Sequence, residues 1–292
     1  MKKIIAMILV AIMAFGCVSA FAACAPTKDP NTLVMATNAA FPPYEYKEGD
    51  GYAGIDVEIA TAIAEKLGKK LEIADIDFGA IIGGVETGKY DFGMAGLTVT
   101  DERMEQVNFS TTYATGVQVI IVRADSAITS LDDFYASFDE EGNPIGLAEG
   151  NKDLFGSDGI KIGVQQDTTG DIYCSDDYTN WGFNTLDAEG TTKIDRVIRY
   201  KTGAEAVEAL KTGKVDAVII DNEPAKSFVE ANDGAVKILE SGEYITEEYA
   251  ICVNKADTKL LKQINEALAA LKADGTLDRI IAKYINDGSS AE

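Results

Sequence analysis

Short apolar runs alternate with helical patterns over most of this sequence. Residues 33–37 form an apolar run that ends at polar Asn38, and apolar residues then recur every fourth position from Ile55 to Leu67. The run fits a buried strand, and the four-residue period fits one face of an amphipathic helix. Strands separated by helices favour mainly parallel sheets covered by helices. The pattern therefore predicts an α/β fold.

The same alternation continues to the end of the chain. Further strands are expected at residues 71–73, 117–122, 160–164, 197–200, 215–220 and 250–253. Further helices are expected to begin near Ser130, Thr169, Gly203 and Thr258, and a last helix to run from Leu277 to Ile285. Two polar segments, residues 139–159 and 175–190, interrupt the pattern and are expected to be surface loops.

A five-residue pattern occurs twice, 125 residues apart: Thr-Gly-Lys-Tyr-Asp at residues 87–91 and Thr-Gly-Lys-Val-Asp at residues 212–216. Gly-Lys is common at helix ends, so this repeated pattern alone does not determine the fold. The apolar runs that follow end at Gly96–Thr98 and at Asp221. In open α/β sheets, ligands bind beyond the carboxyl ends of the strands. We therefore expect two lobes that present these polar groups to a shared cleft.

The first residues have the layout of an export signal. A basic start is followed by the uncharged stretch Ile4–Phe15 and then by small residues. The stretch is shorter than the roughly 20 residues that span a membrane. We predict a signal peptide at residues 1–23 and a protein that acts outside the cytoplasm.

The end of the signal allows two interpretations. Ala20–Ala22 fits ordinary signal cleavage, whereas Ala22-Ala23-Cys24 resembles the lipobox of bacterial lipoproteins. We favour the second, in which Cys24 carries a lipid anchor to the cell membrane and residues 24–30 form a linker. A free periplasmic or secreted form is the alternative.

Composition excludes several classes of function. The 48 acidic and 26 basic residues give a formal net charge of -22, which would repel nucleic acid. The absence of histidine excludes histidine-based triads and imidazole acid–base chemistry. Cys174 and Cys252 could form a disulfide or remain two buried thiols, and the sequence leaves both open. We expect no metal and no cofactor.

Several motifs occur in a recognisable order. They are Phe41–Tyr46 with Gly54–Ile59, Asp77-Phe78, Gly96–Arg103, Phe109-Ser110, Gly163–Gln165 with Thr168–Gly170, and Val215–Asp221. With them the chain resembles bacterial extracellular solute-binding proteins of family 3, the polar amino-acid receptors of ABC importers, over roughly residues 31–287.

The resemblance implies the two-lobed fold of type II periplasmic binding proteins, in which each lobe is a mainly parallel sheet flanked by helices. Lobe 1 would comprise residues 31–113 and 249–288, and lobe 2 residues 117–245. Two hinge strands, residues 113–117 and 245–249, would join them.

A free amino acid offers one carboxylate and one ammonium group, and the motifs contain a candidate partner for each. Arg103 could bind the carboxylate with two parallel hydrogen bonds. Thr168 and Thr169 open a helix, where free N–H groups favour an anion. Asp221 would accept from the ammonium group, and a charge-paired Asp221 should have a pKa below its ordinary value. The Gly96 carbonyl and the Thr98 hydroxyl would accept from the ammonium group together with Asp221.

The resemblance also implies which residues would enclose the aliphatic part of the ligand and which would contact the end of its side chain. Phe41 and Phe78 would pack against the aliphatic part of the ligand, and Asn38 and Gln165 would meet its side chain. Relatives that bind basic amino acids often have an acid in place of Asn38, which argues against a basic ligand. Asp167, where relatives often have glycine, disfavours a second negative charge. We therefore expect a neutral polar amino acid.

Three classes of function are compatible with this fold. The chain could bind an amino acid and deliver it to a membrane permease, act as a periplasmic dehydratase-like enzyme, or sense a ligand as a receptor domain. The complete set of ammonium and carboxylate partners favours a binding protein that is not an enzyme. Its expected partners are the amino acid and the permease. We expect a monomer with no nucleic-acid partner, in contact with the membrane through the lipid anchor only.

Overall fold

The computed structural model describes residues 29–135, 137–138, 140, 144–145, 151–155, 159–175, 185–186, 193–194, 196–239 and 246–285. The predicted signal peptide, Cys24 and most of the two polar segments lie outside the described residues. The architecture below is that of the unit that begins at Leu33.

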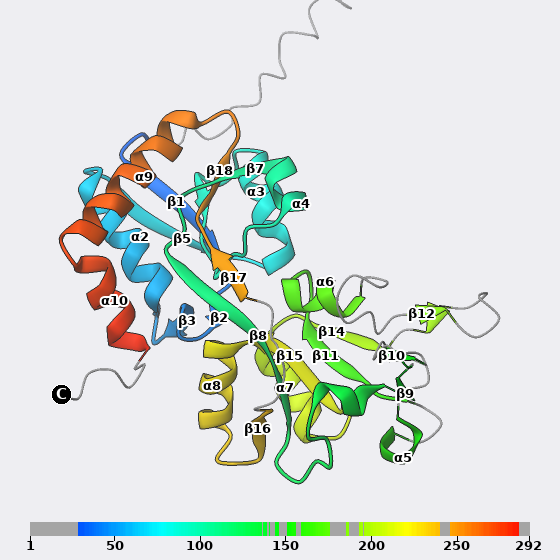
Figure 1. The fold of residues 1–292 in the computed structure, drawn as a ribbon. Helices are drawn as coiled ribbons and strands as arrows, with labels where there is room; N and C mark the ends of the chain where they lie inside the picture. The colour runs from blue at the N-terminus through cyan, green and yellow to red at the C-terminus, as the bar shows by residue number, and fades with distance from the viewer. Residues whose placement is uncertain are drawn as a thin grey trace, which may run out of the picture. The chain divides into compact units, whose positions relative to one another are not determined.

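The first lobe is built on a five-stranded sheet in the order β5-β1-β6-β18-β7. Its strands are β1 (Thr32–Thr37), β5 (Lys70–Asp75), β6 (Phe92–Gly93), β7 (Val107–Phe109) and β18 (Cys252–Asn254). Its helices are α2 (Ile55–Lys66), α3 (Ile81–Glu86), α4 (Asp101–Gln106), α9 (Thr258–Ala273) and α10 (Thr276–Tyr284). A short turn of 3-10 helix, η1 (Phe78–Ala80), precedes α3, and β2 (Ala40–Phe41), β3 (Glu45–Glu48) and β4 (Gly51–Ala53) form a small antiparallel sheet. Figure 1 shows α2, α9 and α10 together, away from α3 and α4.

The second lobe is built on a six-stranded sheet in the order β14-β11-β15-β8-β16, in which β17 also pairs with β8. Its strands are β8 (Ala114–Arg123), β11 (Ile162–Gln165), β14 (Val197–Tyr200), β15 (Ala217–Asp221), β16 (Val236–Ile238) and β17 (Thr246–Tyr249). Its helices are η2 (Leu131–Phe134), α5 (Lys152–Phe155), α6 (Thr169–Ser175), α7 (Gly203–Lys211) and α8 (Asn222–Ala231). Two further strand pairs are β9 (Ser137–Phe138) with β10 (Pro144–Ile145), and β12 (Thr185–Leu186) with β13 (Lys193–Ile194).

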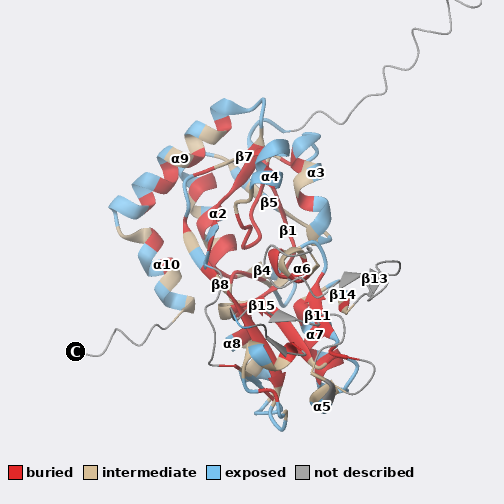
Figure 2. Ribbon diagram, turned by 45° about the vertical axis from the view of Figure 1, so that its right-hand side comes forward, coloured by how far each residue is buried: buried red, intermediate tan, exposed pale blue. Residues whose placement is uncertain are grey.

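Both sheets are buried on both faces. Along β1, Leu33 and Met35 pack with α2, α9 and α10, whereas Val34 and Ala36 point to the opposite cluster, which contains Ile81 of α3. Alternate side chains of a strand point to opposite faces, so an unbroken apolar run supplies two cores at once. In Figure 2 the buried residues follow the strands and the inner faces of the helices, while the outer faces of α9 and α10 are exposed.

The predicted elements are largely confirmed. The four-residue period from Ile55 does form the buried face of α2, with Ile55, Ile59 and Ile63 almost completely buried. Burying each such side chain contributes about 1.5–3 kcal/mol. The helix expected near Ser130 is only the 3-10 turn η2, in which Ser130 and Asp133 form a reciprocal cap and the chain returns to an extended conformation at Tyr135.

The sheets are mixed rather than mainly parallel. β1–β6, β11–β14 and β11–β15 are parallel, but β8 is antiparallel to β15, β16 and β17, and β18 is antiparallel to β6 and β7. The antiparallel pairs involve β8, β17 and β18, where the chain passes into the second lobe and returns. Their direction is therefore set by the connection between the lobes and not by helix crossovers.

The predicted hinge ranges fall on two paired strands. Ala114–Val117 of β8 pairs with Thr246–Tyr249 of β17 in antiparallel register, and residue 245 lies outside the described part. Bending at these strands remains a prediction. Cys174 and Cys252 are both buried free thiols, which decides between the two alternatives for this pair. No helix within the described ranges has the length and apolar character needed to span a membrane.

Candidate ligand-binding site

A small cavity lies where the strand ends of the two sheets meet. It is lined by Asn38, Phe41, Glu45, Phe78, Ala95, Gly96, Thr98, Arg103, Gln165, Thr168, Thr169 and Asp221. All ten residues that the sequence predicted for the site are in this lining. The structure therefore brings the predicted set together from both lobes, although the role of each residue toward a ligand remains a prediction.

Arg103 is a buried cation held at the start of α4. Thr100 caps this helix by accepting from the Arg103 backbone N–H at 3.2 Å. The guanidinium donates from Nη1 to the Thr98 carbonyl at 2.8 Å and from Nη2 to the Asp167 carbonyl at 3.2 Å, and its Cζ lies 5.4 Å from the centre of the Phe78 ring. A guanidinium has five N–H donors. Within the described ranges the other three N–H donors have no hydrogen-bond partner and remain for an anion, and the two carbonyl contacts fix the orientation of the guanidinium group.

Asp221 ends the fully buried strand β15, and its side chain does not cap helix α8. The Tyr249 hydroxyl donates a hydrogen bond to its Oδ1 instead. Burial and, after it, the charge of Glu247 raise the pKa of Asp221 to about 8. The lowered pKa expected of a charge-paired Asp221 refers to the complex with a ligand cation and stays a prediction; without that cation, desolvation of the group dominates.

Glu247 is a buried carboxyl group that the sequence interpretation missed. Its Oε2 accepts from the Thr98 hydroxyl at 2.9 Å and from Gln118 Nε2 at 3.2 Å. Its Oε1 is buried without a hydrogen-bond partner among the described residues. Along β17, Glu247 and Tyr249 are buried while Thr246 and Glu248 are exposed. The sequence of this strand, Thr-Glu-Glu-Tyr, has an acid on each face and therefore gave no signal for which acid faces inward.

Glu45 and Asp56 form a second pair of buried carboxyl groups. Asp56 Oδ2 accepts from the Gly96 backbone N–H at 2.8 Å and from the Tyr113 hydroxyl at 2.9 Å. Burial raises the pKa of Asp56 to about 6, and burial together with Asp56 raises the pKa of Glu45 well above its usual value. Neither oxygen of Glu45 has a hydrogen-bond donor among the described residues. One proton shared by this pair at neutral pH would satisfy both groups.

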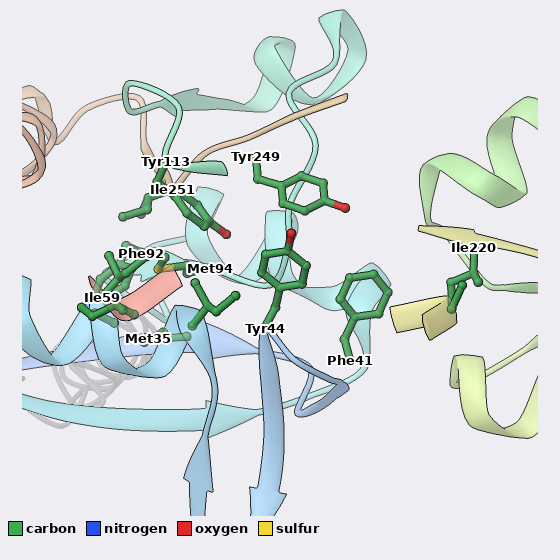
Figure 3. Packing of buried hydrophobic residues seen from close by; sticks show 14 of the residues in the cluster. Met35, Phe41, Tyr44, Ile59, Phe92, Met94, Tyr113, Ile220, Tyr249 and Ile251 are labelled. Carbon is green, nitrogen blue, oxygen red and sulfur yellow. The ribbon is translucent and has the colours of Figure 1, made fainter. Parts of the chain in front are cut away.

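Asp56 also fixes the backbone at Gly96. Gly96 has a φ of 52°, and a Cβ at this position would lie 2.9 Å from the Phe41 ring. A side chain would therefore be both strained and in contact with a wall of the cavity. Phe41 stacks on Tyr44, which meets Tyr249 edge to face at a centroid distance of 5.1 Å. Figure 3 shows these three rings beside one another.

Two amide side chains in the cavity lining connect the lobes. Gln165 Nε2 of the second lobe donates to Asn38 Oδ1 of the first lobe at 3.0 Å, and Asn38 Nδ2 donates to the Ile76 carbonyl at 2.8 Å. Thr168 donates through its hydroxyl to the Gln165 carbonyl at 2.8 Å, and Thr169 begins α6. The lobes are thus in direct contact through these amide groups, as they are at Arg103.

Comparison with known proteins gives a consistent result. Residues 33–287 match the model of the family described as bacterial extracellular solute-binding proteins, family 3. The arginine-binding extracellular protein ArtP of Bacillus subtilis (strain 168) is 28% identical over 252 residues, covering 86% of this chain and 85% of ArtP. The ABC transporter arginine-binding protein 1 of Escherichia coli (strain K12) is 25% identical over 284 residues, covering 96% of this chain and 97% of that protein.

Solved structures show the same fold. An ancestral arginine-binding protein bound to glutamine has a TM-score of 0.70 and 33% identity, over 89% of this chain and 100% of that one. The ancestral amino acid-binding protein AncCDT-1, a precursor of cyclohexadienyl dehydratase, has a TM-score of 0.69 and 28% identity, over 87% of this chain and 95% of that one. The described architecture is therefore that of the type II periplasmic binding proteins.

Proposed function

The chain belongs to the bacterial extracellular solute-binding proteins, family 3, and from this premise we propose that it binds a free amino acid between its lobes and delivers it to the membrane permease of an ABC transporter. One observation carries the proposal. Arg103 of the first lobe and Asp221 of the second lobe, a cation and an acid that are both buried, line the same small cavity. Their charges are complementary to the carboxylate and ammonium groups of an amino acid.

The hydrogen bonds around the cavity define how the ligand would bind. The ligand carboxylate would take the free N–H groups of Arg103 and a backbone N–H at Thr169. The ammonium group would donate to Asp221 and to the Thr98 hydroxyl, whose own hydrogen is used toward Glu247. A ligand held from both lobes would stabilise the closed cleft and favour bending at the paired strands β8 and β17.

We propose a neutral polar amino acid as the first candidate ligand. The part of the cavity lined by Asn38 and Gln165 carries two amide groups, which can both donate to and accept from a polar side chain. These groups carry no charge, so they require none on the ligand.

A cationic amino acid is the second candidate. Glu45 lines the cavity with two oxygens that have no hydrogen-bond donor in the described part of the chain, and ArtP is named for arginine binding. A guanidinium or ammonium group in this position would take the place of the proton on the carboxyl pair of Glu45 and Asp56.

A thermal-shift screen of the free amino acids tests the proposed function. A ligand at 100 times its dissociation constant raises the free energy of unfolding by about 2.7 kcal/mol. Arg103→Ala is the matched control and should lose the shift. Glu45→Gln separates the two candidates, because it should weaken arginine binding by at least about tenfold and leave glutamine binding nearly unchanged. If no free amino acid shifts the wild-type protein, the proposal fails.

A dehydratase-like activity is the second candidate function, because AncCDT-1 is a precursor of such an enzyme and the raised pKa of Asp221, about 8, would keep a proton available at neutral pH. Incubation with a cyclohexadienyl acid such as prephenate, followed by absorbance of the aromatic product, tests it. The ligand roles of Arg103 and Asp221 favour binding without chemistry, so we expect no turnover.

We also propose that the mature protein is a monomer outside the cytoplasm, anchored by a lipid on Cys24. Mass spectrometry of the N-terminal peptide tests the modification. Cys24→Ala should release the protein from the membrane fraction, whereas an unmodified Cys24 or unchanged fractionation would argue for the free form.

A further inference from the structure

At the rim of the cleft, the loop before α6 lies against the turn η1 of the other lobe. A Cβ built on Gly79 would lie 2.0 Å from Asp167 Oδ2, 2.8 Å from its Cγ and 3.2 Å from its Cβ. Both residues also line the two larger spaces that border this contact. The Asp167 side chain therefore occupies the space that a side chain at residue 79 would need.

The backbone of Asp167 is fixed in an unusual conformation. Its φ is 64°, a left-handed value that few residues other than glycine adopt. Its N–H donates to Asp171 Oδ2 at 3.1 Å, and Arg199 Nε holds the same carboxylate at 2.9 Å. Gln166 Nε2 donates to Asp167 Oδ2 at 3.2 Å. The side chain of Asp167 is thus oriented by its own lobe before it meets Gly79.

The same residue contacts the guanidinium of the proposed carboxylate site. The Asp167 carbonyl accepts from Arg103 Nη2 at 3.2 Å, and the Phe78 ring, next to Gly79 in the chain, lies against the same guanidinium. How closely Asp167 approaches Gly79 consequently determines where its carbonyl meets Arg103.

We propose that Asp167 and Gly79 are positioning residues that set how far the two lobes close over the ligand and how the Arg103 guanidinium is oriented toward it. The inference rests on the proposed amino-acid binding. Neither residue touches the ligand. Gly79 leaves a space, Asp167 fills it from the other lobe, and the close approach brings the Asp167 carbonyl to Arg103.

A methyl group at residue 79 should oppose closure specifically. Rotation of Asp167 could move Oδ2 and Cγ away, but its Cβ would stay 3.2 Å from the new methyl carbon, closer than an ordinary contact of 3.4–4 Å. The rim would have to widen, and the hydrogen bond from Arg103 would lengthen. The two residues belong to different lobes, so the clash is absent when the lobes are apart.

The test is a rescue experiment by isothermal titration, with the free amino acids from glycine to arginine as probes. Gly79→Ala should weaken the amino acid that the wild type binds best by about tenfold or more, since small misplacements of binding groups have large effects. Adding Asp167→Gly should restore the dissociation constant to within about threefold of wild type. Glycine removes the clash, adopts the φ of residue 167 without strain, and keeps the carbonyl.

Gly83→Ala is the matched control, because a Cβ at Gly83 on α3 would meet no atom of the described residues within 4 Å apart from its chain neighbours and its own helix backbone. It should leave the dissociation constant unchanged, and none of the variants should lower the thermal midpoint of the ligand-free protein. Normal affinity in Gly79→Ala, or a loss that Asp167→Gly does not reverse, would overturn the proposal. A wild-type protein that binds none of the amino acids would instead overturn the proposed function, and this inference with it.

Discussion

The affinity for the ligand should rise with pH between about 6 and 8, because the ligand ammonium group needs the ionised form of Asp221. Burial and the neighbouring Glu247 raise the pKa of Asp221 to about 8, whereas the side chain in water titrates near 3.9. In the closed arrangement of this structure, the ligand-free site holds a proton on Asp221 below a pH of about 8, and the ammonium group must displace it. Release of one proton on binding makes the association constant increase by up to about tenfold per pH unit.

The size of the effect follows from the same pKa. If the ligand-free cleft is closed as in this structure, so that Asp221 titrates near 8, and Asp221 is fully ionised in the complex, raising the pH from 6 to 8 should strengthen binding by up to roughly 50-fold, or about 2.3 kcal/mol; opening of the free cleft reduces this rise, because water then solvates Asp221. The ligand adds little to this change, since its carboxylate is ionised and its ammonium group protonated over most of the range. A ligand affinity that does not change with pH, as expected if Asp221 had an ordinary pKa, would therefore not be observed.

Isothermal titration in two buffers with different ionisation enthalpies measures both the affinity and the number of protons released. The release should approach one proton per ligand near pH 6 to 7. Glu247→Gln removes the neighbouring negative charge but keeps an acceptor for Thr98 and Gln118, so it should lower the pKa of Asp221 and move the rise in affinity to lower pH. A dissociation constant that stays within about threefold over this range, with no buffer dependence, would refute the reasoning: Asp221 would then already be ionised in the ligand-free protein.

Three further predictions concern the two charged binding residues Arg103 and Asp221, the stability of the ligand-free protein and the motion of the lobes. Arg103→Ala and Asp221→Ala should each weaken binding, measured by isothermal titration, by at least about 10²-fold, because each leaves a buried charge of the ligand unpaired. A loss below tenfold for both variants would contradict their assigned roles as partners of the ligand carboxylate and ammonium groups. The ligand-free protein should melt at a higher temperature near pH 5 than near pH 8. The pKa values of Asp56 and Asp221 are raised to about 6 and about 8, so the stability that their protonated forms contribute is complete below the unfolded pKa near 4 and is lost as the pH rises through the folded values. Calorimetry in high salt, which screens surface repulsion, checks this, and an equal or higher melting temperature near pH 8 would contradict it. Small-angle scattering should show a contraction on ligand addition by bending at residues 113–117 and 245–249, and an unchanged radius of gyration argues against that motion.

The element positions could be predicted because apolar periodicity reports burial directly. Ile55 and Ile59 recur at helical spacing and are buried on one face of α2. Whether neighbouring strands run parallel or antiparallel leaves no such signal in the sequence. The antiparallel pairing of β8 with β15 depends on where the chain crosses between the lobes, and that is a property of the connection. The prediction of mainly parallel sheets failed for this reason.

The candidate site was predictable where polar residues lie at or beyond the end of a strand, as Asp221 does at the end of β15 and Thr98 does beyond β6. The missed groups Glu45, Asp56 and Glu247 are acids in a chain with 48 acidic residues, and local sequence does not distinguish a buried acid from a solvated one. Only the fold places their carboxyl groups out of water, and desolvation then changes their pKa values. The ligand roles of the predicted residues stay predictions until binding is measured.

The two candidate ligands should differ in how many protons they displace. Glu45, Asp221 and the cation Arg103 line the cavity, and each of the two acids has a second buried carboxyl group beside it, Asp56 beside Glu45 and Glu247 beside Asp221. Unpaired buried charges are far less stable than protonated groups, so each pair keeps a proton until a ligand cation replaces it. A neutral amino acid brings one ammonium group and should release about one proton near pH 7, from Asp221. A cationic amino acid also reaches Glu45 and should release nearly two.

Buffer-dependent calorimetry with glutamine and arginine measures this difference directly. In Glu45→Gln the second proton is absent from the start, so arginine should release about one proton and bind more weakly, while glutamine should behave as in the wild type. Arginine that binds tightly to the wild type without releasing more protons than glutamine would mean that Glu45 and Asp56 keep their shared proton in the complex. The side-chain cation would then be neutralised elsewhere, and the carboxyl pair would serve only to hold the backbone of Gly96 in place.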